Sequence, residues 1–185
     1  MDRPERRRTD VSPTLTAPPP PRTAPLDFEA LYRGARDDVF AYVATLLRDR
    51  AAAEDVTAAA FERAFRRRRT FRPDRGTPRA WLFGIARNAA LDELRRRKRA
   101  AALTAEPADA DAHGPEENAE AALRRAAVRA GLAGLDPRER ELIALKFHAG
   151  LANAEIAAVL GVSVSNAGTQ LHRAMTKLRE AVEHA

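Results

Sequence analysis

Apolar side chains recur along this chain every three or four residues, and no stretch alternates apolar and polar side chains as a half-buried strand would. This spacing places the apolar residues on one face of a helix. Only 5% of the 185 residues are aromatic, so the cores must be built mostly from Ala, Leu, Val and Ile. We therefore predict an all-α fold, and the chain is too short for the large barrels and doubly wound sheets of many enzymes.

Charge divides the sequence into blocks. Residues 26–100 carry 18 basic and 11 acidic side chains, and residues 121–185 carry nine basic and six acidic ones. Between them, residues 101–120 hold six acidic side chains and no Lys or Arg. We interpret this pattern as two small helical domains joined by a flexible acidic linker. Residues 1–25 are rich in Pro and Arg with little to bury, which predicts a disordered N-terminal arm.

The overall composition limits the classes of partner and compartment. A net charge of +6 favours polyanionic partners, nucleic acid above all. The chain has no cysteine, which excludes disulfides, thiolate nucleophiles and Cys-ligated zinc. No apolar run approaches the roughly 18 residues that a membrane span needs. These features predict a cytoplasmic protein without a membrane span.

The first domain ends in a segment suited to nucleic acid. Thr77 and Pro78 predict the start of a helix, as its N-cap and first residue. Trp81 is expected to point from that helix into the core of the domain. Asn88 lies at helical spacing from several arginines, so an amide able to bond a base edge shares a face with phosphate-seeking cations. Phe71 stands in the preceding Pro/Gly loop among arginines. Its ring would either stack on a base taken out of the duplex or plug the core.

The second domain carries the spacing of a helix-turn-helix. Asp136, Pro137 and Glu139 predict a capping box, and Gly161 ends a short helix before Ser163 caps the next one. A polar set on the last helix then points outward and suits the major groove. A plain helical hairpin with a solvated face is the alternative interpretation.

Three segments, in order, resemble the extracytoplasmic-function (ECF) class of bacterial sigma-70-family RNA polymerase sigma factors. Residues 53–61 (AEDVTAAAF) are similar to the polymerase-binding helix of that family. Residues 77–97 (TPRAWLFGIARNAALDELRRR) are similar to its promoter-melting and −10 recognition helix. Residues 155–163 (EIAAVLGVS) with residues 171–174 (LHRA) are similar to its −35 reader.

The resemblance implies a function and a set of site residues. Residues 26–100 would be sigma region 2, which binds core polymerase and the −10 element, and residues 121–185 would be sigma region 4, which binds the −35 element. Together they would promote DNA melting for transcription initiation, with no catalysis and no cofactor or metal in this chain. The residues implied in binding core polymerase are Glu54, Asp55, Val56, Phe61 and Phe65. Those implied at the −10 element are Phe71, Arg75, Asn88, Asp92, Arg95, Arg96 and Arg99. Those implied at the −35 element are Ser165, Asn166, Thr169, Gln170, His172 and Arg173.

The implied partners are bacterial core RNA polymerase, promoter DNA and, in some family members, an anti-sigma factor; the free chain is expected to be a monomer. A helix-turn-helix transcriptional regulator that acts without polymerase is the alternative, but it leaves the first domain unexplained. A metal-dependent enzyme is disfavoured because the four histidines show no ligand spacing.

Two departures from the family pattern concern the second domain. Ala152 and Asn153 stand where a Ser or Thr cap and an aromatic residue are common, so Asn153 is expected to supply the cap one residue late. Gly168 and Gln170 stand where basic residues are usual, which predicts weak or unusual −35 binding.

Overall fold

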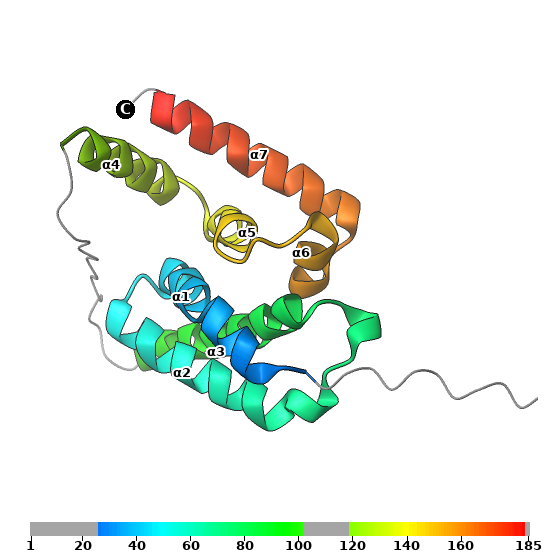
Figure 1. The fold of residues 1–185 in the computed structure, drawn as a ribbon. Helices are drawn as coiled ribbons and strands as arrows, with labels where there is room; N and C mark the ends of the chain where they lie inside the picture. Colours follow the sequence, from blue (N-terminus) through cyan, green and yellow to red (C-terminus); the bar gives the residue numbers. More distant parts are fainter. Residues whose placement is uncertain (1–25, 102–118, 184–185) are drawn as a thin grey trace, which may run out of the picture.

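The computed structural model describes residues 26–101 and 119–183, and all regular structure in those two segments is helical (Figure 1). The predicted all-α fold is therefore confirmed. The predicted N-terminal arm and residues 102–118 of the predicted linker lie outside the described residues. Within the described segments, no helix combines the length and the apolar character needed to cross a membrane.

The first module consists of three α-helices and the loop that precedes the third. The helices are α1 (Phe28–Leu47), α2 (Arg50–Arg67) and α3 (Pro78–Ala101), and two short 3-10 turns, η1 (Arg68–Thr70) and η2 (Pro73–Arg75), lie between α2 and α3. The helices pack pairwise through their apolar faces, so that Val39, Ala60 and Leu82 are completely buried. The loop is thereby held at one end of this three-helix core (Figure 1).

Side chains at the start of each helix of the first module satisfy backbone amides that have no partner within the helix. The Asp27 carboxylate accepts the amide three residues on at 2.9 Å, and Asp49 does the same at 3.1 Å. The Thr77 hydroxyl accepts the amide of Ala80 at 3.2 Å, and Pro78 follows it as the first helical residue. The predicted start of the third helix is therefore confirmed.

The second module consists of four helices, α4 (Ala119–Ala133), α5 (Pro137–Phe147), α6 (Asn153–Leu160) and α7 (Val164–Glu183). Helices α4 and α7 lie side by side, and α5 and α6 lie beneath them (Figure 1). Helices α6 and α7, joined by a tight turn, form the predicted helix-turn-helix. Helix α4 was not predicted from the sequence, and its first two residues fall within the stretch expected to be linker.

Three of the local signals in the second module act as expected. The Asp136 carboxylate accepts the amides of Arg138 and Glu139 at 2.8 and 2.9 Å, and the Glu139 carboxylate accepts the Asp136 amide at 3.1 Å, which completes the capping box. Gly161 ends α6 with φ +70°, a left-handed conformation that glycine adopts without strain. The Ser163 hydroxyl accepts an amide of the first turn of α7 at 3.2 Å.

The expected cap at Asn153 is wrong. Helix α6 already begins at Asn153, and Ala152 occupies the N-cap position. An alanine side chain cannot accept a hydrogen bond, so only the reciprocal half of a capping box forms: the Glu155 carboxylate accepts the Ala152 amide at 2.9 Å. Asn153 is one residue inside the helix, where its side chain can no longer play the capping role.

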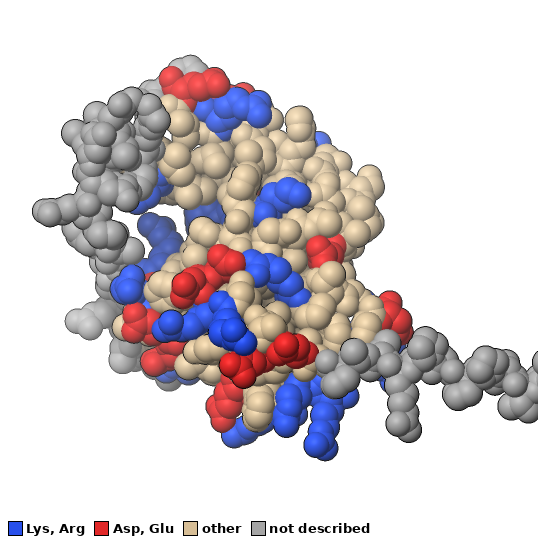
Figure 2. Space-filling model, in the orientation of Figure 1, with Lys and Arg blue, Asp and Glu red and all other residues tan. Residues whose placement is uncertain are grey.

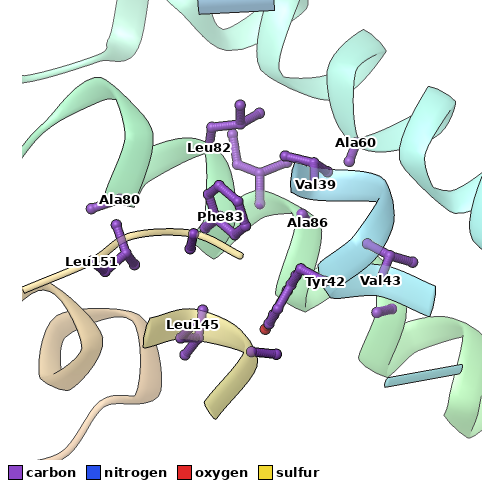
Figure 3. Packing of buried hydrophobic residues seen from close by; sticks show 14 of the residues in the cluster. Val39, Tyr42, Val43, Ala60, Ala80, Leu82, Phe83, Ala86, Leu145 and Leu151 are labelled. Atoms are coloured by element: carbon purple, nitrogen blue, oxygen red, sulfur yellow. The ribbon is translucent and has the colours of Figure 1, made fainter. Parts of the chain in front are cut away.

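The two modules pack against each other. Helix α5 contacts α1, and helix α6 contacts α3. Tyr42 and Phe83 of the first module and Leu145 and Leu151 of the second are almost completely buried in one continuous apolar cluster (Figure 3). Sequence periodicity predicted a core for each module but gave no sign of this shared one.

Candidate nucleic-acid and polymerase interfaces

A cavity of about 450 Å³ opens where the loop after η1 meets the start of α3. This volume lies within the range of pockets that hold small organic groups. Three residues predicted from the sequence line the cavity together: Phe71, Arg75 and Asn88. The structure therefore places an aromatic ring, a cation and an amide around one hollow, which are the groups that stack on a base, attract a phosphate and bond a base edge.

Trp81 packs against the core, as the sequence predicted, but it is only half-buried and also lines the same cavity. Its ring meets Phe71 edge to face, with 5.6 Å between the ring centroids. Phe71 is also half-buried, so it both packs on Trp81 and presents part of its ring to the cavity. Both roles proposed for Phe71 from the sequence are compatible with this position.

The basic residues predicted farther along α3 lie outside the cavity and are partly neutralised. Arg95 pairs with Asp92 at 3.1 Å, and Arg96 pairs with Glu93 at 2.7 Å. Hydrogen bonds from Arg96 and then Arg97 lower the pKa of Glu93, so this carboxylate stays ionised beside the arginines. Arg99 is exposed at the end of the helix. This part of α3 is a mixed-charge surface, on which Arg95 and Arg96 share carboxylates of their own helix.

The predicted polymerase-binding residues divide between the surface and the core of α2. Glu54 and Asp55 are exposed, and Glu54 pairs with Arg50 at 3.4 Å. Phe65 is 48% exposed, an unusual position for a large aromatic side chain. Val56 and Phe61 are buried, at 9% and 6% exposed. These two side chains position the helix rather than covering its outer surface.

A groove of about 570 Å³ runs between α1 and α2 beside these residues. Phe40 and Arg50 stand at its edge, with the guanidinium 5.2 Å from the ring centroid. Thr57 also lines it, and within the described residues the buried Thr57 hydroxyl has no hydrogen-bond partner. Neither Phe40 nor Thr57 was identified from the sequence, because Phe40 lies beside the apolar stripe of α1 and Thr57 has no local pattern that distinguishes it from other helical residues.

The outward face of α7 carries the predicted −35 residues. Ser165, Thr169 and His172 are exposed. Three further residues from the predicted set line a polar hollow between α7 and the start of α5: Asn166, Gln170 and Arg173. The Gln170 amide donates to Asn166 at 2.7 Å and its oxygen accepts from Arg138 at 3.1 Å, so Gln170 is held in a hydrogen-bonded network.

Gly168 does not lie on the open face of α7. A Cβ atom at Gly168 would lie 3.6 Å from the side-chain nitrogen of Asn153 in α6, at ordinary van der Waals distance. The glycine therefore faces the other helix of the helix-turn-helix.

Charged side chains are unevenly distributed over the visible face of the molecule. Figure 2 shows Lys, Arg, Asp and Glu interleaved over the first module, whereas the surface over α6 and the adjacent part of α7 is mostly neutral. Among the described residues, no group of three His, Asp or Glu side chains is arranged to hold a metal ion.

Comparison with known proteins agrees with this architecture. Residues 31–100 match sigma-70 region 2, and residues 119–178 match sigma-70 region 4. The two regions define a class of two-module transcription initiation factors that direct RNA polymerase to promoters. The chain belongs to the sigma-70 family, as a sigma factor of the ECF class.

Two relatives and one solved structure illustrate the likeness. The chain is 34% identical to the ECF RNA polymerase sigma factor BldN of Streptomyces coelicolor, over 82% of this chain and 58% of BldN. It is 35% identical to the RNA polymerase sigma factor CarQ of Myxococcus xanthus, over 83% of this chain and 87% of CarQ. The sigma factor RpoE of Bartonella quintana, solved in complex with the anti-sigma factor NepR, has the same fold, with a TM-score of 0.72, 22% identity and coverage of 85% of this chain and 97% of RpoE.

Proposed function

We propose that this chain binds core RNA polymerase through its first module, holds one unstacked base of the melted −10 strand in the α3 cavity, and reads the −35 element with α7. The cavity carries this proposal, because Phe71, Arg75 and Asn88 converge on it from a loop and a helix. A site that binds unstacked single strand better than duplex shifts DNA toward the melted state without breaking any bond. The chain therefore needs no catalytic group of its own.

Polymerase contact belongs to the outer surface of α2 and the groove beside it. Of the residues predicted to contact polymerase, Glu54, Asp55 and Phe65 are exposed there, two carboxylates and an apolar ring. An aromatic side chain at the centre with charged groups around it matches the apolar core and polar rim of protein interfaces.

Duplex recognition belongs to α7. Its exposed Ser165, Thr169 and His172 would reach base edges or phosphates in the major groove, and Arg173 would add a cation. The hydrogen bonds that hold Gln170 to its neighbours leave it less free to contact DNA. This arrangement supports weak −35 binding, in which most of the promoter affinity comes from polymerase contact and the −10 strand.

The remaining assignments follow from the proposed role. The first module acts as sigma region 2 and the second as sigma region 4, in the cytoplasm where polymerase works. The acidic residues between them form a tether, and an anti-sigma factor is a further partner, since RpoE of the same fold was solved bound to one.

Run-off transcription tests the proposal. Purified core polymerase is supplied with a genomic DNA library, with and without the chain, and the transcripts are sequenced. The proposal predicts a small set of defined start sites that appear only when both proteins are present. The proposal would be contradicted if the same transcripts appeared without the chain. It would also be contradicted if the chain alone protected DNA from nuclease cleavage and added polymerase did not change that protection.

A further inference from the structure

A second hollow, the α1–loop groove, lies on the outer side of the loop that precedes α3. It has a volume of about 930 Å³, at the upper end of the range for pockets that hold drug-sized molecules, and its lining is mostly apolar. Five apolar side chains around the start of α1, in the loop and at the start of α3 form its walls: Leu26, Leu31, Phe71, Pro73 and Pro78. Pro73 is exposed and the other four are half-buried, so each presents apolar surface to the groove.

The chain itself leads into this groove. Leu26 is part of the lining, and residues 18–25, which lie outside the described residues, are joined directly to it. Their sequence, PPPPRTAP, holds five prolines and one charged residue. Consecutive prolines favour the polyproline II helix, an extended rod that needs no hydrogen bonds of its own. At about 3.1 Å per residue, eight residues extend about 25 Å, which is long enough to follow the groove from its Leu26 end.

The apolar walls suit such a rod. Proteins that recognise polyproline II segments use grooves lined by aromatic side chains, because a proline ring offers apolar surface and no backbone N–H donor. Phe71 supplies an aromatic ring to the α1–loop groove, and Leu31 and Pro73 supply apolar surface beside it. A proline run docked here would leave no unpaired backbone donor in the groove.

Charge complementarity favours the same segment. The carboxylates of Asp27 and Glu155 lie on the groove, together with one cation, Arg79. The Arg79 guanidinium is already paired, since it donates to the Asp38 carboxylate at 2.5 Å. The groove therefore presents an excess of negative charge. Arg22, which follows the proline run directly, is the complementary cation.

Covalent attachment makes a weak contact sufficient. A segment tethered close to its site meets that site at an effective concentration in the mM range. A contact with an intrinsic Kd of about 0.1 mM would then be formed in roughly nine molecules of ten. The rod is also preformed, so that docking orders few torsions. A proline-rich segment of another protein would lack the first of these advantages.

Docking on this side also bears on the −10 cavity. Phe71, Gly76 and Thr77 line both hollows, so the loop is the wall between them. Two backbone hydrogen bonds within the loop are long: the Phe71 amide donates to the Arg68 carbonyl at 3.4 Å, and the Gly76 amide donates to the Pro73 carbonyl at 3.5 Å. Such long bonds hold the loop weakly. Packing against its outer side would fix the ring of Phe71 in place.

We propose that the α1–loop groove binds the chain's own residues 18–25 as a polyproline II rod, and that the docked rod holds the loop in the position that forms the −10 cavity. The effect on DNA rests on the proposed function, whereas the docking does not. The arm of a second copy and a proline-rich segment of another protein are the competing occupants.

Distance measurements between spin labels test the docking. The chain has no cysteine, so Ala17→Cys, next to the proline run, and Ala59→Cys, at an exposed position of α2, can be labelled without background. The purified doubly labelled chain should give one narrow distance distribution, which an excess of unlabelled chain should leave unchanged. A broad distribution would overturn the inference, because it would leave the groove to another protein. A narrow distribution that is lost on dilution would also overturn it, because the arm would then dock on a second copy.

A variant that fills the groove separates docking from the stiffness of the prolines. Ala30 is an exposed alanine in the first turn of α1 and lines the groove, so Ala30→Arg should displace the rod and broaden the distribution while the arm keeps its sequence. Ala51→Arg is the matched control, at an exposed alanine in the first turn of α2, and should leave the distribution narrow. Both variants should keep the helix content measured by circular dichroism. An unchanged distribution in Ala30→Arg, or equal broadening in both variants, would overturn the docking.

Binding of a labelled single-stranded oligonucleotide measures the effect on the loop. Pro18→Ser, Pro19→Ser, Pro20→Ser and Pro21→Ser together keep the net charge, so electrostatic attraction to DNA does not change. This variant should bind about threefold more weakly, the factor expected when one more side chain has to be ordered on binding. Pro4→Ser with Pro13→Ser is the control and should bind as the unchanged chain does.

The two parts of the inference fail separately from the proposed function. Equal binding by the two proline variants would overturn the support of the loop. The spin-label distances are measured without DNA or polymerase, so they decide the docking alone. Absence of promoter-directed transcription in the run-off experiment would remove the proposed function and leave a narrow distance distribution as it stands.

Discussion

The unpaired Thr57 hydroxyl in the α1–α2 groove allows a prediction about stability. Thr57 is 7% exposed, and its Oγ1 has no hydrogen-bond partner among the described residues. Since an unsatisfied buried polar atom costs about 1 kcal/mol or more, Thr57→Val should raise the free energy of unfolding by about 1 kcal/mol. Urea unfolding measures this change. Thr45→Val is the matched control, because the Thr45 hydroxyl already donates to the Ala41 carbonyl at 2.9 Å, and a similar gain there would contradict the argument.

Phe71 supports a second prediction at the same scale. Stacking of a base on an aromatic side chain contributes about 1–3 kcal/mol, so Phe71→Ala should lower the yield of open promoter complexes by roughly tenfold. Core polymerase binding should not change, since Phe71 lies on the cavity and away from the exposed face of α2. Phe71→Tyr keeps the ring and should preserve opening. Equal opening by Phe71→Ala and the unchanged chain would show that the cavity holds no base.

Single residues also show where the sequence is informative. The caps at Thr77, Asp136 and Ser163 were predictable because each bonds an amide two or three residues away. Asn153 was misassigned as the cap because α6 begins at Asn153 itself, so that Ala152 occupies the N-cap position. Trp81 packs against the core as expected, and part of its ring also lines the cavity because of the path of the loop before α3, which has no local signature.

Two glycines within helices allow a prediction at the level of elements. Alanine stabilises a helix interior by about 1 kcal/mol relative to glycine, so Gly168→Ala in α7 should raise the free energy of unfolding by roughly that amount. Its Cβ atom has room, at 3.6 Å from Asn153. Gly131→Ala in α4 should gain less, because its Cβ atom would lie 2.9 Å from Leu178 Cδ1 and α4 or Leu178 must shift. An equal gain at both positions in thermal or urea unfolding would contradict this packing of α4 on α7.

The capping box of α5 gives a prediction with a defined pH dependence. Bonds from the amide of Glu139, and then of Arg138, lower the pKa of Asp136. A carboxylate with a lowered folded-state pKa stabilises the protein above its ordinary pKa, and the contribution is lost as pH falls through the folded-state value. Asp136→Ala should therefore cost about 1 kcal/mol at neutral pH. In urea unfolding the difference from the unchanged chain should shrink as the solution becomes acidic.

Asp136→Asn is the control for this titration. The amide oxygen can still cap the helix but does not titrate, so the acid-dependent part of the difference should disappear while most of the stability is kept. A cost of Asp136→Ala that stays constant from neutral to strongly acidic pH would show that the ionised carboxylate is not the stabilising group.

Elements were predictable from the sequence where an apolar stripe and a cap coincide, as in α3 and α7. Helix α4 was missed because its sequence, AEAALRRAAVRAGLA, is rich in alanine and has few large side chains to define a face. Helix α4 packs on α7, which is distant in sequence. Gly131 lies on the face of α4 that contacts α7. That contact comes from tertiary packing and cannot be inferred from local periodicity.

At the scale of the whole molecule, the sequence predicts two modules but not their contact. The charge blocks and the acidic stretch between them separate the modules clearly. The partners that join them, such as Arg87 with Glu141 and Arg79 with the end of α5, are ordinary helical residues more than 50 positions apart. Pairing across such a distance requires the fold itself, which is why the contact between the modules was found only in the structure.

Permanganate reacts with unpaired thymines, so it measures whether this chain enables polymerase to melt a promoter. A promoter identified by run-off transcription is treated with core polymerase alone, with the chain alone and with both. We expect reactive, unpaired thymines at the −10 element only when both proteins are present. If the duplex stays unreactive with both proteins while the chain alone still protects the DNA, the chain does not enable melting and is instead a regulator that acts without polymerase.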